Sequence, residues 1–238
     1  MTTQTITDTP SGERTEAALP GVSAAGAKVP AHGTSELIRI RELEAELRSV
    51  RSATVVALCQ MLDLKDLGTG LHSTRLGEWG VRLSSALGLD QDGTRAVEVA
   101  ALLHDIGKVG ISDDILWNPG ELTDEEMALM RRHPEFGWCI LRAFPELEQA
   151  ALFVLHHHEH ENGAGYPAGL AGEEIPLGAR IVSVIDAFDA MISTRPYRKG
   201  LPFDEVVRRL VAASGTQFDP VVVKCFLKIA EAEWSLLR

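Results

Sequence analysis

The chain has 238 residues, of which 45% are hydrophobic, and its formal net charge is −11 at pH 7. This length suits one large domain or two small ones with a sizeable apolar core. The acidic balance excludes a generic surface for polymeric nucleic acid, because such a surface needs clustered Lys and Arg in excess. A phosphate ligand would therefore need cations supplied locally.

The N-terminus, the apolar runs and the cysteines together predict a cytoplasmic protein. Cys59, Cys139 and Cys225 are odd in number, far apart and set among apolar neighbours, which predicts reduced core residues and no disulfide framework. No apolar run approaches the roughly 18 residues that a membrane span needs. The N-terminus carries Thr, Asp and Glu where a signal peptide needs a basic and then an apolar region.

The first part of the chain divides in two. Residues 1–35 have almost no large apolar side chains and cannot offset the entropy of ordering, so we expect a disordered leader. Residues 36–64 predict a helix with apolar side chains spaced 3, 4 and 3 apart: Ile40, Leu43, Leu47 and Val50. Two interpretations stay open: a stalk that forms a homodimer through residues 36–60, or a helix that docks on its own domain.

Beyond this helix the sequence predicts an all-α domain. Apolar residues keep helical spacing in eight segments, with no convincing strand run: 71–88, 92–108, 123–131, 134–143, 147–160, 177–193, 203–214 and 219–236. Thr123 with Glu126 forms a capping box, and Pro134 and Pro220 lie where a first helical turn tolerates proline. The irregular segment 161–175 is rich in glycine, and so long a loop inside a compact domain is usually functional.

Potential metal ligands lie at the ends of these predicted helices. His104-Asp105 and His157-His158 each end an apolar helix, and His133 opens another. Asp186 and Asp189 are three residues apart and share one face of a further helix. Imidazole is the commonest metal ligand in proteins, and a buried carboxylate must be paired or metal-bound. Together these residues supply enough nitrogen and oxygen ligands for two metals.

Several motifs, in the right order from about residue 66 to 228, resemble the HD-GYP domain, a branch of the HD phosphohydrolases. The motifs are LHDIGKVGISDDIL, NPGELTDEEMALMRRHPEFGWCIL, HHEHENGAGYPAGLAGEEIPLGARIVSVIDAFDAM and STRPYRKG. The resemblance implies a multi-helix HD-type bundle with an N-terminal helical stalk, in which residues 65–238 form the catalytic domain. It also implies hydrolysis of cyclic di-GMP to pGpG, and often on to GMP, with two or three transition metals, usually iron or manganese.

The resemblance also assigns roles to individual residues. Seven match the metal ligands of the family: His72, His104, Asp105, His133, His157, His158 and Asp186. Asp105 would bridge the metals, and with it Lys108, which matches a phosphate-contacting lysine, would be catalytic. Four match substrate-binding positions: Tyr166 of the GYP motif, Asp189 near the guanine, and the cations Arg195 and Arg198.

The sequence departs from the family pattern in three ways. Gly68 stands where three-metal members carry a ligating Glu, and since glycine cannot ligate, we expect two metals. Asn162 replaces an Asp of the GYP loop, which predicts reshaped loop contacts without lost catalysis. No receiver or sensory module is evident before the domain, so regulation would come through dimerisation, a separate partner protein or the metal state.

Two rival functions stay open at this stage. One is a binding module that keeps the metals and affinity for cyclic di-GMP but signals through protein contacts. The other is an HD hydrolase of a different cyclic dinucleotide, since base discrimination depends on hydrogen-bond geometry that a sequence does not display.

Overall fold

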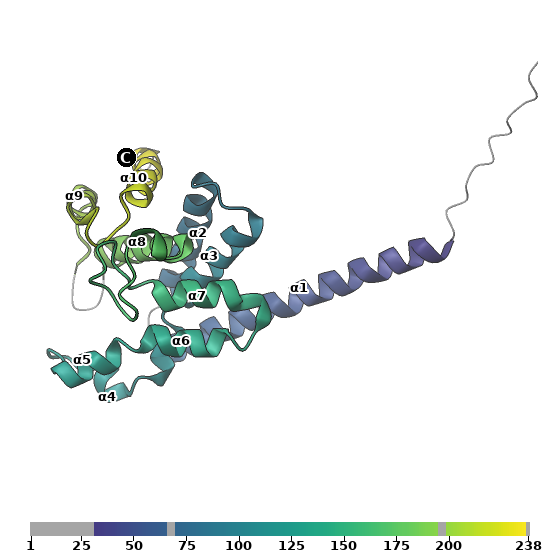
Figure 1. Ribbon diagram of the computed structural model, residues 1–238, viewed down its shortest axis with the longest axis horizontal. Coiled ribbons are helices and arrows are strands. Elements are labelled where there is room, and N and C mark those ends of the chain that lie inside the picture. The colour runs from purple at the N-terminus through teal and green to yellow at the C-terminus, as the bar shows by residue number, and fades with distance from the viewer. Residues whose placement is uncertain (1–30, 66–69, 195–198, 237–238) are drawn as a thin grey trace, which may run out of the picture. The chain divides into compact units, whose positions relative to one another are not determined.

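The computed structural model describes residues 31–65, 70–194 and 199–236 (Figure 1), without the side chains of residues 31–34, 63–64, 70–72 and 234–236. The described chain is helical throughout and contains no β-strand, which confirms the predicted all-α fold. Its α-helices are α1 (Ala31–Lys65), α2 (Gly70–Ala86), α3 (Gln91–Leu103), α4 (Asp113–Leu116), α5 (Asp124–Met130), α6 (His133–Leu141), α7 (Glu148–His156), α8 (Leu177–Ile192), α9 (Phe203–Ala213) and α10 (Pro220–Leu236). Three short 3₁₀ helices join them: η1 (Ile106–Gly110), η2 (Pro145–Leu147) and η3 (Gly172–Glu174).

The chain divides into two compact units, residues 1–47 and 48–238. In the first unit, the described residues form the N-terminal half of α1, which begins at Ala31, inside the segment expected to be a disordered leader. The rest of that leader lies outside the described residues. The second unit begins well before the expected boundary at residue 65, because Val55 and Leu62 of α1 are buried in its core.

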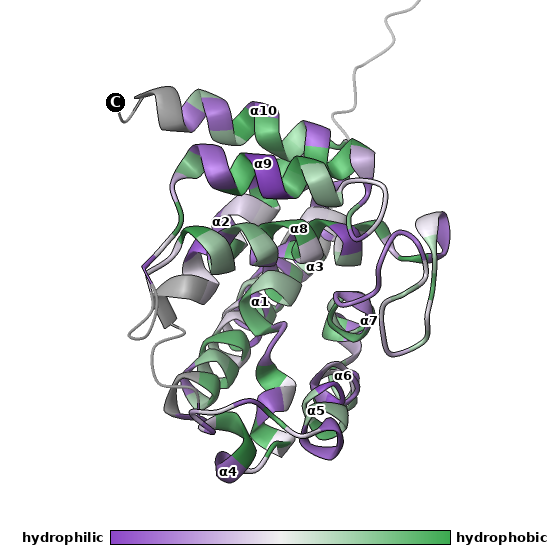
Figure 2. Ribbon diagram, turned by 90° about the vertical axis from the view of Figure 1, so that its left-hand side faces the viewer, coloured by the Kyte–Doolittle hydropathy of each residue, from purple (hydrophilic) through white to green (hydrophobic). Residues whose placement is uncertain are grey.

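Helix α8 is the centre of the second unit. It contacts α2, α3, α7, α9 and α10, and Figures 1 and 2 show α9 and α10 above it and α7 below it. Ile181, Val182, Val184 and Ile185 are fully buried, so apolar side chains surround this helix on nearly all sides, as expected of a helix in a core. The Phe188 ring continues this core by packing edge-to-face on Trp79 and Phe226.

The contacts between helices bring distant chain segments to one place. Helix α3 contacts α7 and α8, and α6 contacts α7 and η1. The C-terminal ends of α3 and α7, the N-terminal end of α6 and the middle of α8 therefore meet. Six of the seven residues predicted as metal ligands lie at these points: His104, Asp105, His133, His157, His158 and Asp186.

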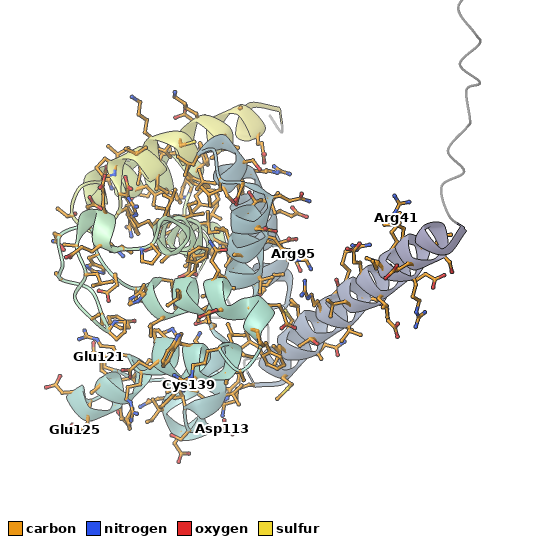
Figure 3. All side chains as sticks on the ribbon, turned by 45° about the vertical axis from the view of Figure 1, so that its right-hand side comes forward. Arg41, Arg95, Asp113, Glu121, Glu125 and Cys139 are labelled. Carbon is orange, nitrogen blue, oxygen red and sulfur yellow. The ribbon has the colours of Figure 1, made fainter. Side chains whose placement is uncertain are left out.

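The cysteine prediction needs one correction. All three cysteines are free, as expected, but Cys139 is exposed on the outer side of α6 (Figure 3), and Cys59 and Cys225 are half-buried. Helix α6 buries His133, Pro134, Gly137 and Leu141, and position 139 lies on the other side of the helix.

None of the helices in the described part of the chain combines the length and the apolar composition of a membrane span.

Candidate metal centre

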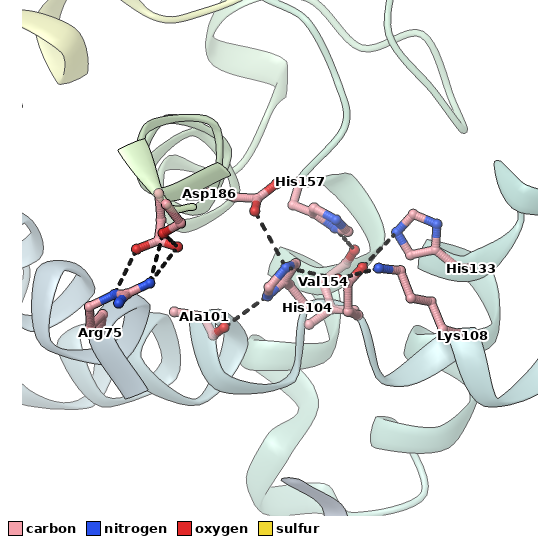
Figure 4. Close-up of polar contacts among 11 residues, drawn as sticks. Arg75, Ala101, His104, Lys108, His133, Val154, His157 and Asp186 are labelled. Carbon is pink, nitrogen blue, oxygen red and sulfur yellow. Dashed lines mark hydrogen bonds and ion pairs between the residues drawn. The ribbon is translucent and has the colours of Figure 1, made fainter. Parts of the chain in front are cut away.

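Four histidines from three helix ends lie close together. Atoms of His133, His157 and His158 that could bind a metal all lie within 4.8 Å of one another. The ring of His104 lies edge-on to that of His157, with ring centroids 5.5 Å apart. Figure 4 shows the side chains of His104, His133, His157 and Asp186 close to one another. These histidine nitrogens thus lie close to one another at the helix ends.

Three of these rings are held by the same kind of hydrogen bond to the backbone. In each ring Nδ1 donates to a carbonyl three residues earlier: His104 to Ala101 (2.9 Å), His133 to Met130 (2.9 Å) and His157 to Val154 (2.7 Å). Because a carbonyl can only accept, Nδ1 carries the proton, and where the ring is neutral Nε2 keeps its lone pair, the usual arrangement of a metal-binding histidine. The Nε2 atoms of His133 and His157 are buried and make no hydrogen bond with any described residue. These donors fit a metal ion.

Two carboxylates complete the cluster. Asp105 approaches two histidines with different oxygens: Oδ2 lies 3.3 Å from Nε2 of His104, and Oδ1 lies 3.5 Å from Nε2 of His133. Asp186 places Oδ1 3.6 Å from Nε2 of His104. Lys108 donates to Oδ2 of Asp105 at 2.7 Å. A carboxylate whose two oxygens face different histidines is arranged as a bridging ligand would be.

Burial keeps most of these imidazoles neutral. It lowers the pKa of His133 and, together with the neighbouring imidazoles, lowers the pKa of His157 strongly and that of His158 to about 3. Neutral imidazole is the form that binds metal. Burial would also lower the pKa of His104, but the carboxylates of Asp105 and Asp186 outweigh it and raise that pKa to about 9.

Asp105 is held in its charged form. Burial alone would raise the pKa of its carboxyl group, but the charges of Lys108 and His104 hold that pKa well below its usual range. A charged carboxylate at this depth needs cations close by, and a divalent metal would supply them.

Gly107 explains how the chain turns after Asp105. A Cβ atom at this position would overlap the backbone carbonyl oxygen of His133 and crowd the amide of Gly137. Only glycine lets η1 lie against the start of α6. The close approach fixes the distance between Asp105 and His133, so the glycine of the HDIG sequence is part of the architecture of the site.

The glycine-rich loop places Tyr166 on the cluster. The buried carboxylate of Glu159 accepts the amides of Ala168 (2.7 Å) and Leu170 (3.1 Å), and the amide of Tyr166 donates to the carbonyl of His158 (3.1 Å). The Tyr166 ring stacks on the His158 ring, with centroids 4.9 Å apart. Burial raises the pKa of the Tyr166 hydroxyl to about 12, so this hydroxyl stays protonated at neutral pH.

Asn162 stabilises the turn of the same loop. Its side-chain oxygen accepts the amide of Ala164 at 3.0 Å, and the residue is exposed. This is a local loop contact of the kind expected from its replacement of an Asp.

Asp189 is bound by other residues of the chain. Its carboxylate is 1% exposed and accepts two hydrogen bonds from Arg75 of α2, at 2.9 and 3.1 Å, and one from Ser193 at 2.9 Å. A guanine would have to replace these partners. Asp189 therefore connects α8 to α2, and its predicted place near the guanine stays a prediction.

Three predicted site residues cannot be placed. Arg195, Arg198 and the side chain of His72 lie outside the described residues, as does Gly68, so their roles stay predictions.

Three residues that were not predicted from the sequence contact the site residues or hold them in place. Glu159 anchors the loop, Arg75 binds Asp189, and the guanidinium of Arg131 lies 5.6 Å from the centre of the Tyr166 ring. Glu159 could have been found, because it directly follows the two histidines. Arg75 and Arg131 carry no local signal, since their partners are distant in the sequence.

Comparison with known proteins shows the family of this chain. The family described as "HD domain" matches residues 56–222. The chain is 38% identical to the cyclic di-GMP phosphodiesterase response regulator RpfG of Xanthomonas campestris, over 82% of this chain and 54% of that protein. It is 41% identical to a cyclic di-GMP phosphodiesterase of Thermotoga maritima, over 74% of this chain and 48% of that protein.

A solved structure supports the fold. A cyclic GMP-AMP specific phosphodiesterase of Vibrio cholerae (V-cGAP3) aligns with a TM-score of 0.58 at 22% identity, over 75% of this chain and 48% of that chain. The chain spans about half the length of the curated relatives it matches.

Proposed function

Because the chain belongs to the HD domain family and carries the motifs of its HD-GYP branch, we propose that it is a metal-dependent phosphodiesterase that hydrolyses cyclic di-GMP to pGpG, and possibly further to GMP. The convergence of His104, Asp105, His133 and their neighbours at the helix ends carries this proposal. The curated relatives bearing the name cyclic di-GMP phosphodiesterase support the choice of substrate.

The metals of this proposal are two divalent ions, iron or manganese. The described residues that would hold them are His104, Asp105, His133, His157, His158 and Asp186, with Asp105 as the bridge and His72 as a further predicted ligand. When bound, such metals activate water and stabilise negative charge on phosphoryl oxygens. The number two rests on Gly68, which offers no ligand atom.

Lys108 has the position that a phosphate-binding cation needs. It lies beside the cluster and bonds to Asp105 at 2.7 Å. With metal held by the carboxylate of Asp105, the Lys108 ammonium would bind the substrate phosphate. Arg195 and Arg198 are proposed to add further positive charge, which an acidic protein needs to attract an anionic substrate.

Tyr166 and Arg131 form the proposed base site. A purine can stack on the face of a tyrosine ring. The Arg131 guanidinium lies over that ring, 5.6 Å from its centre, so a base that stacks there would lie beside this cation. Arginine reads the O6 and N7 acceptors of guanine, whereas adenine presents an N6 donor beside its N7. The pair therefore favours guanine over adenine.

The decisive experiment uses protein purified without oxygen and loaded with iron or manganese. Incubation with cyclic di-GMP should yield pGpG by chromatography, in proportion to the bound metal measured by elemental analysis. Asp92→Ala, which removes an exposed carboxylate from the other end of α3, is the matched control and should leave the rate unchanged. Metal-loaded protein that gives no product would contradict the proposal.

The same experiment separates the rival functions. Binding of cyclic di-GMP without product, regardless of the metal supplied, would indicate a binding module that acts through protein contacts. A panel with cyclic di-AMP and cyclic GMP-AMP tests the second rival, and faster turnover of either one would change the substrate. Arg131→Ala should narrow the ratio of kcat/KM between guanine and adenine dinucleotides.

We propose in addition that the enzyme is cytoplasmic and forms a homodimer through residues 36–60. A separate regulatory protein stays a prediction.

A further inference from the structure

Helix α1 carries an apolar stripe that the proposed phosphodiesterase reaction does not use. In the first unit, Ile40, Leu43 and Leu47 are 46–49% exposed, and in the second unit Val50 and Met61 are 57% and 53% exposed. We call these residues, with Thr54 and Ala57 at the intervening positions, the heptad stripe. Large apolar side chains in such a row are costly to leave in water, which indicates an interaction surface.

The spacing of the heptad stripe identifies its partner. From residue 40 to residue 61 its members alternate at intervals of three and four, which is an average period of 3.5 residues. A straight helix that packs on a globular domain keeps a period near 3.6, whereas a sustained 3.5 period is typical of a left-handed coiled coil. The stripe therefore fits another helix with the same repeat, and a second copy of α1 offers one.

The alternative of a helix that docks on its own domain accounts for a different face. In the second unit Val55 and Leu62 are buried, and Leu58 packs against the same core. These residues lie about 100° around the helix from Thr54, Ala57 and Met61. Docking thus uses one face and leaves the heptad stripe exposed, so the two interpretations do not exclude each other.

Charged residues beside the heptad stripe favour one orientation, parallel or antiparallel, of two α1 helices. Each heptad contributes two core residues, and the first of each two are Ile40 and Leu47. In a parallel coiled coil, the residue directly before such a first core residue faces the residue of the partner helix whose number is five higher. Arg39 then faces Glu44, and Glu46 faces Arg51, so both pairs have opposite charges. Arg39 also pairs with Glu42 of its own helix at 3.3 Å, but both side chains are largely exposed and such pairs are weak.

An antiparallel pair over the same length satisfies fewer of these charges. Arg39 and Glu46 would then face Gln60 and Ala53 of the partner, which carry no charge. We infer that two copies of this chain associate through α1 in a parallel, in-register coiled coil along the heptad stripe. This assembly does not depend on the proposed reaction.

Sedimentation equilibrium of the full chain tests the association. The expected mass is about twice the 25.8 kDa of one chain. Leu43→Glu with Leu47→Glu should give a monomer, whereas Ala45→Glu, on the outer side of the helix, should leave the dimer intact. A monomeric wild type at micromolar concentration, or a dimer that survives the double substitution, would overturn the inference.

Two further variants test the orientation. Leu43→Cys faces its own copy only in a parallel pair and should form an intermolecular disulfide under mild oxidation, with the wild type run beside it to show any linkage through the native cysteines. Arg39→Glu should weaken the dimer several-fold, and Arg39→Glu with Glu44→Arg should restore it. A dimer that shows neither the cross-link nor the restoration is not parallel.

Discussion

Asp105 is the residue on which the proposed centre depends most. Each of its oxygens faces a different histidine, and Lys108 adds a third polar contact. No other described carboxylate has these three neighbours. Removing it would leave the imidazoles in place but take away the negative charge between them.

We predict that Asp105→Ala loses metal and activity together. Changing even a residue that only supports a ligand typically costs about 10–100-fold in metal affinity or activity, so loss of a bridging ligand should cost at least about 100-fold. Elemental analysis and product formation on the same sample measure both effects. Arg195→Ala should instead mainly raise KM at unchanged metal content, and the opposite pattern would show that the roles are misassigned.

Gly107 gives a prediction about stability. In Gly107→Ala, the new Cβ would meet the backbone of His133, which cannot move without shifting a ligand. Overpacking of this kind costs about 1–3 kcal/mol, and backbone clashes reach the upper part of that range. Urea unfolding measures the loss, with Gly120→Ala in an exposed turn as the control. An equally stable Gly107→Ala protein would mean that η1 does not need its close contact with α6.

At the level of elements, the pair of Arg75 and Asp189 connects α2 to α8. The carboxylate is buried, while about half of the Arg75 side chain is exposed. The pair spans 114 residues of sequence. It joins two helices that each carry a predicted metal ligand one turn earlier, His72 and Asp186.

We expect Arg75→Ala to destabilise the protein by about 1–3 kcal/mol, because a buried carboxylate loses its charged partner. Arg75→Lys should recover part of this loss. Thermal unfolding of both variants and of Asp189→Asn separates this structural role from base binding. If Asp189→Asn raised KM without changing the unfolding temperature, the predicted place of Asp189 near the guanine would be supported.

The helices themselves show how far the sequence could predict the structure. The patterns located every long helix but extended two of them too far, since 92–108 ends at Leu103 and 147–160 ends at His156. The reason is that the Nδ1 atoms of His104 and His157 bond to carbonyls of the last turn, a contact that a hydrophobic pattern does not contain. Helix α4 was not predicted, because a helix of four residues is too short to show a hydrophobic period.

The site was predictable in its ligands and not in its supporting contacts. Histidines and aspartates at helix ends are visible in the sequence. The partners of Asp189 and Tyr166 come from helices far away in the chain, and only the fold brings Arg75 and Arg131 to them. For Asp189, a spacing of three from Asp186 correctly indicated a shared face but could not reveal the arginine already bound there.

For the whole molecule, metal binding and folding should be linked. A ligand that binds only the folded chain stabilises it by about 2.7 kcal/mol at one hundred times its dissociation constant. We therefore expect manganese to raise the unfolding temperature measured by calorimetry and a chelator to reverse this rise. His133→Ala should reduce the response to manganese, while Asp92→Ala should retain it. An unfolding temperature independent of metal would contradict a site formed by the folded chain.

The stack of Tyr166 on His158 has a consequence for the cell. One imidazole lies both in the cluster of metal-binding atoms and against the ring proposed to receive the base. Two ligands that contact one side chain are coupled when binding of one shifts that side chain, and thermodynamic reciprocity then requires each to change the affinity of the other by the same factor. Under the proposed function, such coupling would make the messenger concentration at which this protein acts vary with the supply of its metal.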